Sequence, residues 1–147
     1  MQGFKFKYEN LLEVKQKYED AKKGKLNQAQ SKLKKEKMHL TNLENYQTNC
    51  HIHIASKMEA GVNVGHLKNY HTYLVSLKKN IDTQVEKIEK CNHEIITCRN
   101  ELIQASKEKK TFEKLKEKAK ETFHEEQKKE EANFVDQLVT FKNFSNN

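Results

Sequence analysis

Cysteine and histidine are the side chains of this sequence best suited to metal or nucleophile chemistry, and they gather in two places. The first group is Cys50, His51 and His53, and the second is Cys91, His93 and Cys98. Zinc needs about four such ligands around one point. On a helix, Cys91 and Cys98 lie one heptad apart, too far to share a metal ion or a disulfide. The cysteines fit best as small apolar core residues, so no metal or other cofactor is expected.

The sequence also lacks the arrangements that carry catalysis. None of the seven histidines has a serine or cysteine and a carboxylate at a spacing typical of a triad. There is no glycine-rich phosphate loop and no Walker pattern. Acidic pairs such as Glu125 and Glu126 are expected on exposed helix, where no pocket would shift their pKa values. We therefore expect that the protein is not an enzyme and works through its surfaces.

The strongest pattern is a row of fourteen positions, three and four residues apart, that runs from Leu67 to Phe112. Gln84 and Lys109 are its polar members. The apolar members are Leu67, Tyr70, Leu74, Leu77, Ile81, Ile88, Cys91, Ile95, Cys98, Leu102, Ala105 and Phe112. A period of 3.5 places these residues on one narrow stripe, a seam, of a long helix. Such a seam packs on a partner helix rather than in a broad core.

Two long helices follow from this pattern and from the scarcity of residues that break helices. Proline is absent and there are only four glycines. A weaker seam predicts a first helix over about residues 4–58. Its positions are Tyr8, Leu11, Lys15, Tyr18, Lys22, Leu26, Ala29, Leu33, Glu36, Leu40, Leu43, Gln47, Cys50 and Ile54. Gly61 can end a helix, and residues 60–66 are the predicted turn. The second helix is expected over about 66–141, with a frayed tail at 145–147.

The predicted fold is all-α, an antiparallel coiled-coil hairpin in which residues 1–147 form a single coiled-coil domain. A turn centred near residue 63 would place Phe4 opposite Phe123. Because the second helix is longer, residues from about His124 onward are expected to project past the first helix.

This projecting segment carries an apolar stripe of its own. Phe134, Leu138 and Phe141 recur at i, i+4 and i+7, with Val135 beside them. Exposed helical apolar stripes usually mark a binding surface. Two other interpretations stay open: the N-terminal residues Phe4 and Phe6 fold back onto the stripe, or two copies of the chain pair through it.

Charge is distributed unevenly. The net charge is +7, and residues 15–37 hold nine lysines against three acidic residues. Such a stretch serves nucleic acid, anionic lipid or an acidic protein, or is simply the solvated face of a coiled coil. No apolar run approaches the roughly 18 residues of a membrane span, and the N-terminus has no signal-peptide core. A cytoplasmic location is the default expectation.

Three segments resemble the flagellar export protein FliJ family. The opening from Phe4 to Lys15, followed by Glu19 to Lys22, is similar to the family's N-terminal run. The stretch from Glu113 to Lys118, with Phe123, resembles its charged C-terminal region. Glu131 and Asp136 fall where the family has an acidic pattern.

The resemblance implies a cytoplasmic component of the flagellar type III export apparatus, peripheral at the cytoplasmic face of the membrane through its partners. It implies a stalk that inserts in a hexameric export ATPase, promotes ring assembly and couples it to the membrane export gate and to export chaperones. The implied ATPase-binding residues are Glu131, Phe134, Val135, Asp136, Leu138 and Phe141. The implied gate-binding residues are Tyr70, Leu74, Leu77 and Ile81.

Two other functions compete with this one. A holdase chaperone of prefoldin type would need β-strands at the hairpin base, for which residues 50–65 give a weak signal. A nucleic-acid-binding coiled coil would use the lysines of residues 15–37, and its binding would depend steeply on salt. That stretch has little aromatic content beyond Tyr18 and no groove-reading motif, so no nucleic acid is expected as a partner.

Overall fold

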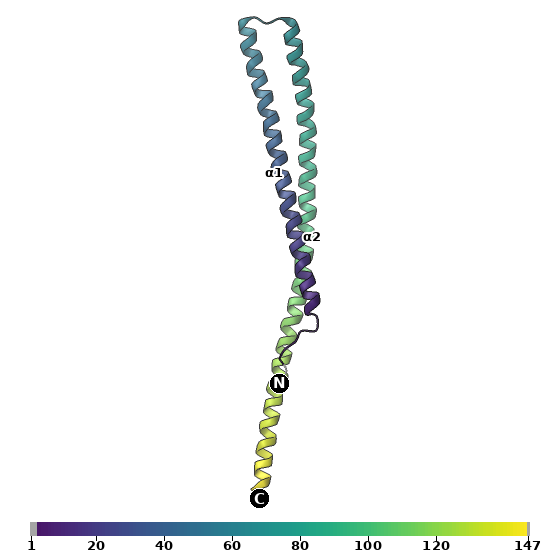
Figure 1. The fold of residues 1–147 in the computed structure, drawn as a ribbon, viewed down its shortest axis with the longest axis vertical. Coiled ribbons are helices and arrows are strands. Elements are labelled where there is room, and N and C mark those ends of the chain that lie inside the picture. Colours follow the sequence, from purple (N-terminus) through teal and green to yellow (C-terminus); the bar gives the residue numbers. More distant parts are fainter. Residues whose placement is uncertain (1–2, 147) are drawn as a thin grey trace. The chain divides into compact units, whose positions relative to one another are not determined.

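Two long helices make up the fold (Figure 1). The computed structural model describes residues 3–146, and no strand occurs among them. Helix α1 runs over Glu9–Ala60 (52 residues) and α2 over Val64–Ser145 (82 residues). The helices pack against each other, which confirms the predicted all-α pair with a longer second helix.

The chain divides into two compact units, each with segments of both helices. The first unit combines the chain up to Ala21 with α2 from Ile103 onward, and the second is Lys22–Leu102. In each unit the two helical segments are antiparallel. That the whole chain forms a single domain stays a prediction.

The seam predicted on α2 is confirmed position by position. All fourteen residues from Leu67 to Phe112 at this spacing are buried or half-buried. Leu77 is 4% exposed, and Ala105 is completely buried. In the second unit Ala29 of α1 packs with Ile95 and Cys98 of α2, with Leu26 and Leu33 against them. All three cysteines are free and buried.

A polar pair interrupts the seam of the second unit. Gln84 is 3% exposed, and its side-chain amide donates hydrogen bonds to the backbone carbonyl of Glu36 (2.9 Å) and to the Glu36 carboxylate. A buried polar group costs free energy unless it finds its partner. This pair therefore favours one register of α1 against α2, as buried polar residues do in other coiled coils.

The turn of the second unit is short because both helices are capped inside it. Gly61 has a φ of 86°, the left-handed conformation expected of a glycine that ends a helix. Asn63 precedes α2, and its side-chain oxygen accepts a hydrogen bond from the backbone N–H of Gly65 (2.9 Å). The non-helical part of this turn is residues 61–63, shorter than the 60–66 expected.

The first unit begins with a non-helical segment, residues 3–8, which we call the N-terminal strap. The first helix was expected to start near Phe4 but starts at Glu9. Phe4 packs on Phe123 with ring centroids 5.6 Å apart, as the sequence predicted, and Tyr8 meets Phe112 edge to face at 6.5 Å. The alternation of aromatic and lysine residues in the strap has the period of an extended chain, which explains why helix begins only after it.

The early seam of α1 is also shifted from the expected one. Leu11 and Tyr18 were predicted to face α2 but are 46% and 47% exposed, whereas Leu12 is half-buried and Glu19 is buried. Glu19 accepts a hydrogen bond from Lys109 at 3.4 Å. Because the two charged residues neutralise each other, a carboxylate takes the seam position that the apolar pattern assigned to a tyrosine.

We expect Leu77→Ala to lower the free energy of unfolding by about 2–4 kcal/mol, since it removes a buried side chain from the seam. The matched control Val75→Ala changes a neighbouring residue that is 55% exposed and should stay within about 0.5 kcal/mol of wild type. Urea denaturation followed by circular dichroism measures both. Equal losses would show that the seam does not carry the stability of this end of the hairpin.

Candidate functional site

The part of α2 after Phe123 is the most exposed apolar segment of the first unit. We call residues 124–145 the C-terminal overhang; Figure 1 shows it in yellow beyond the N-terminal strap. Every residue of the overhang is exposed except Gln127, which is half-buried. Phe134 is 61% exposed, Leu138 52% and Phe141 71%. No part of the described chain covers these three side chains.

Helical geometry brings most of the predicted ATPase-binding residues onto one side of the overhang. At 100° per residue, Glu131, Phe134, Leu138 and Phe141 lie within a single arc, and Val135 lies at its edge. Phe144, which follows the stripe in the sequence, and Val139 were not among the predicted ATPase-binding residues, but both are exposed and widen the apolar surface.

Asp136 lies apart from this stripe. It borders a shallow cavity of about 560 Å³ with Asn133, Gln137, Thr140, Phe141 and Phe144. Thr140 donates a hydrogen bond to the backbone carbonyl of Asp136 at 2.9 Å, an ordinary contact within a helix. Phe141 borders both surfaces, so a partner that surrounds the helix would meet the apolar stripe and the Asp136 side together.

The predicted gate-binding residues lie in the seam of the second unit. Leu77 is buried, and Tyr70, Leu74 and Ile81 are half-buried. Tyr70 also makes an edge-to-face contact with His53 of α1, with centroids 5.6 Å apart. These side chains primarily join the two helices, and among them Tyr70 and Leu74 also border grooves.

Tyr70 and Leu74 border two different grooves near the turn. Tyr70 borders a groove of about 670 Å³, and Leu74 one of about 600 Å³. The first is lined by Tyr46, Asn49, Cys50, His53, His66, Asn69, Tyr70 and Tyr73. This lining has no lysine, arginine or carboxylate, although 33% of the chain is charged. Tyrosine-rich, charge-poor surfaces are typical of the centres of protein interfaces.

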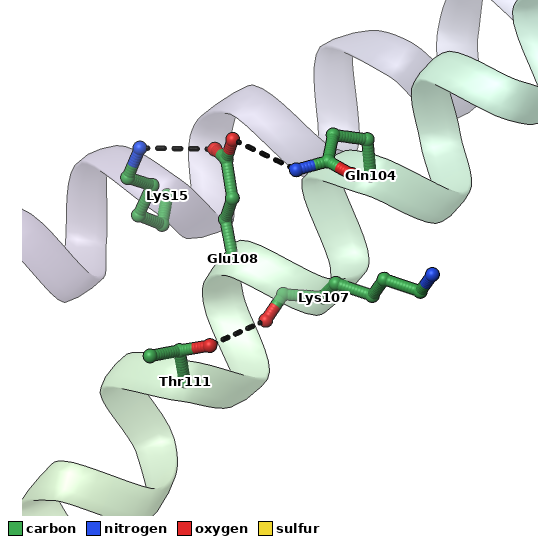
Figure 2. Close-up of polar contacts among 5 residues, drawn as sticks. All are labelled: Lys15, Gln104, Lys107, Glu108 and Thr111. Carbon is green, nitrogen blue, oxygen red and sulfur yellow. Dashed lines mark hydrogen bonds and ion pairs between the residues drawn. The ribbon is translucent and has the colours of Figure 1, made fainter.

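Ion pairs hold the helical segments of the first unit together in the stretch of α2 that precedes the overhang. Lys15 of α1 donates to Glu108 of α2 at 3.0 Å, and Gln104 donates to the other carboxylate oxygen at 3.5 Å (Figure 2). Lys116 contacts Glu9 at 2.9 Å. The hydrogen bond from Lys15, supported by Gln104, lowers the pKa of Glu108.

Two further groups titrate away from their ordinary ranges for the same reason. A hydrogen bond from Lys22 and its positive charge lower the pKa of Glu101 in the second unit. Desolvation opposes the charged form of Lys109, but Glu19 and Glu113 outweigh it and raise the pKa of Lys109. These shifts belong to contacts between or along helices, so they indicate structural charges rather than an acid–base catalyst.

The cysteine and histidine clusters form no metal site in residues 3–146, where no group of three or more suitable ligands comes together. Residues 50–65, which gave a weak strand signal, are helical up to Ala60 and again from Val64. Within the described chain, neither helix contains a segment apolar enough to span a membrane.

Comparison with known proteins gives one family. The family model described as "Flagellar FliJ protein" matches residues 4–147, essentially the whole chain. Neither the curated proteins nor the solved structures gave a match.

We expect acid to weaken the contact between the helices. Because the pKa values of Glu101 and Glu108 are depressed in the folded chain, their stabilisation is present above the ordinary value of 4.5 and is lost as pH falls through the lower folded values. The melting temperature, followed by circular dichroism, should fall in this range. The double variant Glu101→Gln, Glu108→Gln should show a smaller fall than wild type, whereas Glu117→Gln, on the exposed side of α2, should behave as wild type.

Proposed function

The chain belongs to the FliJ family of flagellar export components, and on that premise we propose that it is a non-enzymatic stalk of the type III export apparatus. The C-terminal overhang would insert in the central pore of the hexameric export ATPase. The grooves near the turn would contact the cytoplasmic linker of the membrane export gate. The protein would thus be cytoplasmic and held at the membrane by its partners, which would include export chaperones.

The observation that supports this proposal is the unequal length of the two helices. Helix α2 has 82 residues and α1 has 52, so α2 extends past α1, and its overhang carries an apolar stripe that the described chain does not cover. A single helix with its side chains is about 10–12 Å across, a width that suits a narrow pore. Burying Phe134, Leu138 and Phe141 there would contribute about 1.5–3 kcal/mol for each side chain.

The proposed effect on the ATPase is a shift in its assembly equilibrium. A ligand that binds the closed ring better than its separate subunits stabilises the ring by its difference in affinity. Glu131 and Asp136 lie on different sides of the overhang and would meet basic groups around the pore. The carboxylates would then set orientation, and the apolar stripe would supply most of the affinity.

The proposed gate contact involves the open sides of Tyr70 and Leu74. Leu77 and Ile81 would act indirectly, because they hold α1 and α2 at the spacing that forms the grooves. A gate segment that enters beside Tyr70 would meet tyrosine, histidine and asparagine side chains, which combine apolar contact area with hydrogen-bonding groups.

The full chain should stimulate hydrolysis and ring assembly by the cognate export ATPase, and a chain that ends at Phe123 should not. Steady-state hydrolysis and analytical ultracentrifugation measure the two effects. If the shortened chain stimulates as well as the full chain, the overhang is not the ATPase contact. If neither binds, the stalk function itself is excluded.

A matched pair of variants separates the apolar stripe from the rest of the overhang. Phe134→Ala, Leu138→Ala and Phe141→Ala together should weaken ATPase binding at least roughly 100-fold, since three buried side chains are lost. The control Asn133→Ala, Gln137→Ala and Thr140→Ala changes three residues on the other side and should cost less than roughly tenfold. All six side chains are exposed, so circular dichroism should show unchanged helix content.

Tyr70→Ala should weaken binding to the isolated cytoplasmic linker of the gate roughly tenfold or more, as expected for a tyrosine at the centre of an interface. Stimulation of the ATPase should persist, because the overhang is unchanged. Isothermal titration calorimetry with the linker peptide measures the affinity. Wild-type affinity in this variant would place the gate contact outside the groove beside Tyr70.

A further inference from the structure

The positive charge of the chain is concentrated in the second unit. Residues 22–102 hold 14 of the 28 basic residues but only 8 of the 21 acidic ones. In α1 the stretch 22–43 contains seven lysines and one acidic residue, Glu36. The Glu36 carboxylate lies at the seam, where it accepts a hydrogen bond from Gln84. The outer surface of α1 over this stretch therefore presents lysines and neutral residues alone.

The two lateral sides of the second unit differ in whether their basic residues form ion pairs between the helices. On one side Lys22 pairs with Glu101 at 3.0 Å and Lys32 with Glu94 at 3.6 Å. These pairs fix which heptad positions of α1 and α2 lie together on that side. The corresponding positions on the other side carry Lys37 of α1 and Arg99 of α2.

We call this other side the basic face. Its residues are Lys23, Lys34, Lys37, Met38, Val85, Ile96 and Arg99. Lys34, Lys37 and Met38 line one shallow groove with Gln30, Leu33 and Thr41, which supports their placement on a common side. No ion pair involves Lys34, Lys37 or Arg99 within residues 3–146. Glu89 and Asp82, one and two heptads before Ile96, and Glu44, one heptad after Lys37, are the acidic residues on this side, against Lys23, Lys34, Lys37 and Arg99.

We propose that the basic face binds the surface of an anionic lipid bilayer. Lysines near such a surface are attracted by its negative potential. Met38 is 60% exposed, Ile96 53% and Val85 41%. Apolar side chains among lysines suit the boundary between headgroups and acyl chains, where lysine stems lie along apolar surface and their ammonium groups stay in water.

The same residues fit other anionic partners less well. A partner helix needs an apolar stripe at i, i+4 and i+7, as on the overhang, whereas Met38, Val85 and Ile96 do not follow that spacing on one helix. Nucleic acid bound without a groove-reading motif relies on aromatic side chains for base stacking, and the basic face has none. Its charges are mostly lysines, which act as point charges and lack the bidentate geometry of arginine.

Sedimentation of the full chain with vesicles tests the proposal. Binding is expected to phosphatidylcholine mixed equally with phosphatidylglycerol, not to phosphatidylcholine alone, and should fall as sodium chloride is raised. Lys34→Gln, Lys37→Gln and Arg99→Gln together should lower the partition coefficient at least roughly tenfold. The control Lys35→Gln, Lys87→Gln and Lys90→Gln removes the same charge from the opposite side and should change it less than roughly threefold.

Equal losses in the two triple variants would overturn the proposal, because net charge rather than the basic face would then explain binding. Equal binding to neutral vesicles, or no binding to either kind, would also overturn it. Polyglutamate and RNA are tested as competitors. If either binds through the same three residues while vesicles do not bind, the face serves a macromolecule instead. ATPase stimulation without vesicles should be unchanged in both variants, so this test is independent of the stalk function.

Orientation on the bilayer gives a second readout. The chain has no tryptophan, so Ile96→Trp places a single reporter on the basic face, and Thr97→Trp places one on the opposite side. Vesicles with phosphatidylglycerol should shift the emission of the Trp at position 96 to the blue and expose it to quenching by brominated lipid. The Trp at position 97 should show neither effect. The reverse pattern would overturn the assignment of this face.

Discussion

The narrow seam of α2 is the constraint on which the rest of the structure depends. A stripe with a period of 3.5 buries only one side of a helix, so each covered stretch of α2 needs a matching stretch of α1. From Leu67 to Phe112 every seam position is buried or half-buried. After Phe123 the cover stops. The seam spacing then falls on Glu126, Glu130, Asn133, Gln137 and Thr140, and the apolar stripe of Phe134, Leu138 and Phe141 lies one position later along the helix. The exposed stripe is thus a second stripe, carried by the part of α2 that α1 does not reach.

Polar residues within the seam determine how the helices align. Gln84 with Glu36 and Lys109 with Glu19 place hydrogen-bonding groups where an apolar seam would slide more freely. Removing one member of such a pair leaves the other buried without its partner, which costs more than the pair contributes. The polar pairs therefore lower the stability of the seam somewhat and favour one register of the helices. In the first unit, Phe4 of the strap packs on Phe123 where the overhang begins.

Helix α2 and its buried side could be predicted from the sequence because one periodicity persists over fourteen positions. The buried side of α1 near its start was harder to predict, since Lys15, Glu19 and Lys22 occupy or border the seam. There, ion pairs with α2 decide which residues face it, rather than the spacing of apolar residues. The strap was not predicted from the sequence, because Phe4 and Phe6 were assigned to the first helix. The alternation of these residues with lysines has a period of two, which is typical of an extended chain. The expected contact of Phe4 with Phe123 is nevertheless present, because an extended strap follows the same side of α2.

The candidate sites show a different limit. Tyr70, Leu74 and Leu77 have the same spacing as Phe134, Leu138 and Phe141, and spacing alone does not separate a covered stripe from an exposed one. The separation comes from where α1 begins, and this depends on the strap. Charged residues show the same limit. Lys32 and Lys34 look equivalent in the sequence, but of these two only Lys32 pairs with a glutamate of the other helix. In a two-helix protein, a residue becomes available to a partner when the opposing helix provides nothing to pair with it.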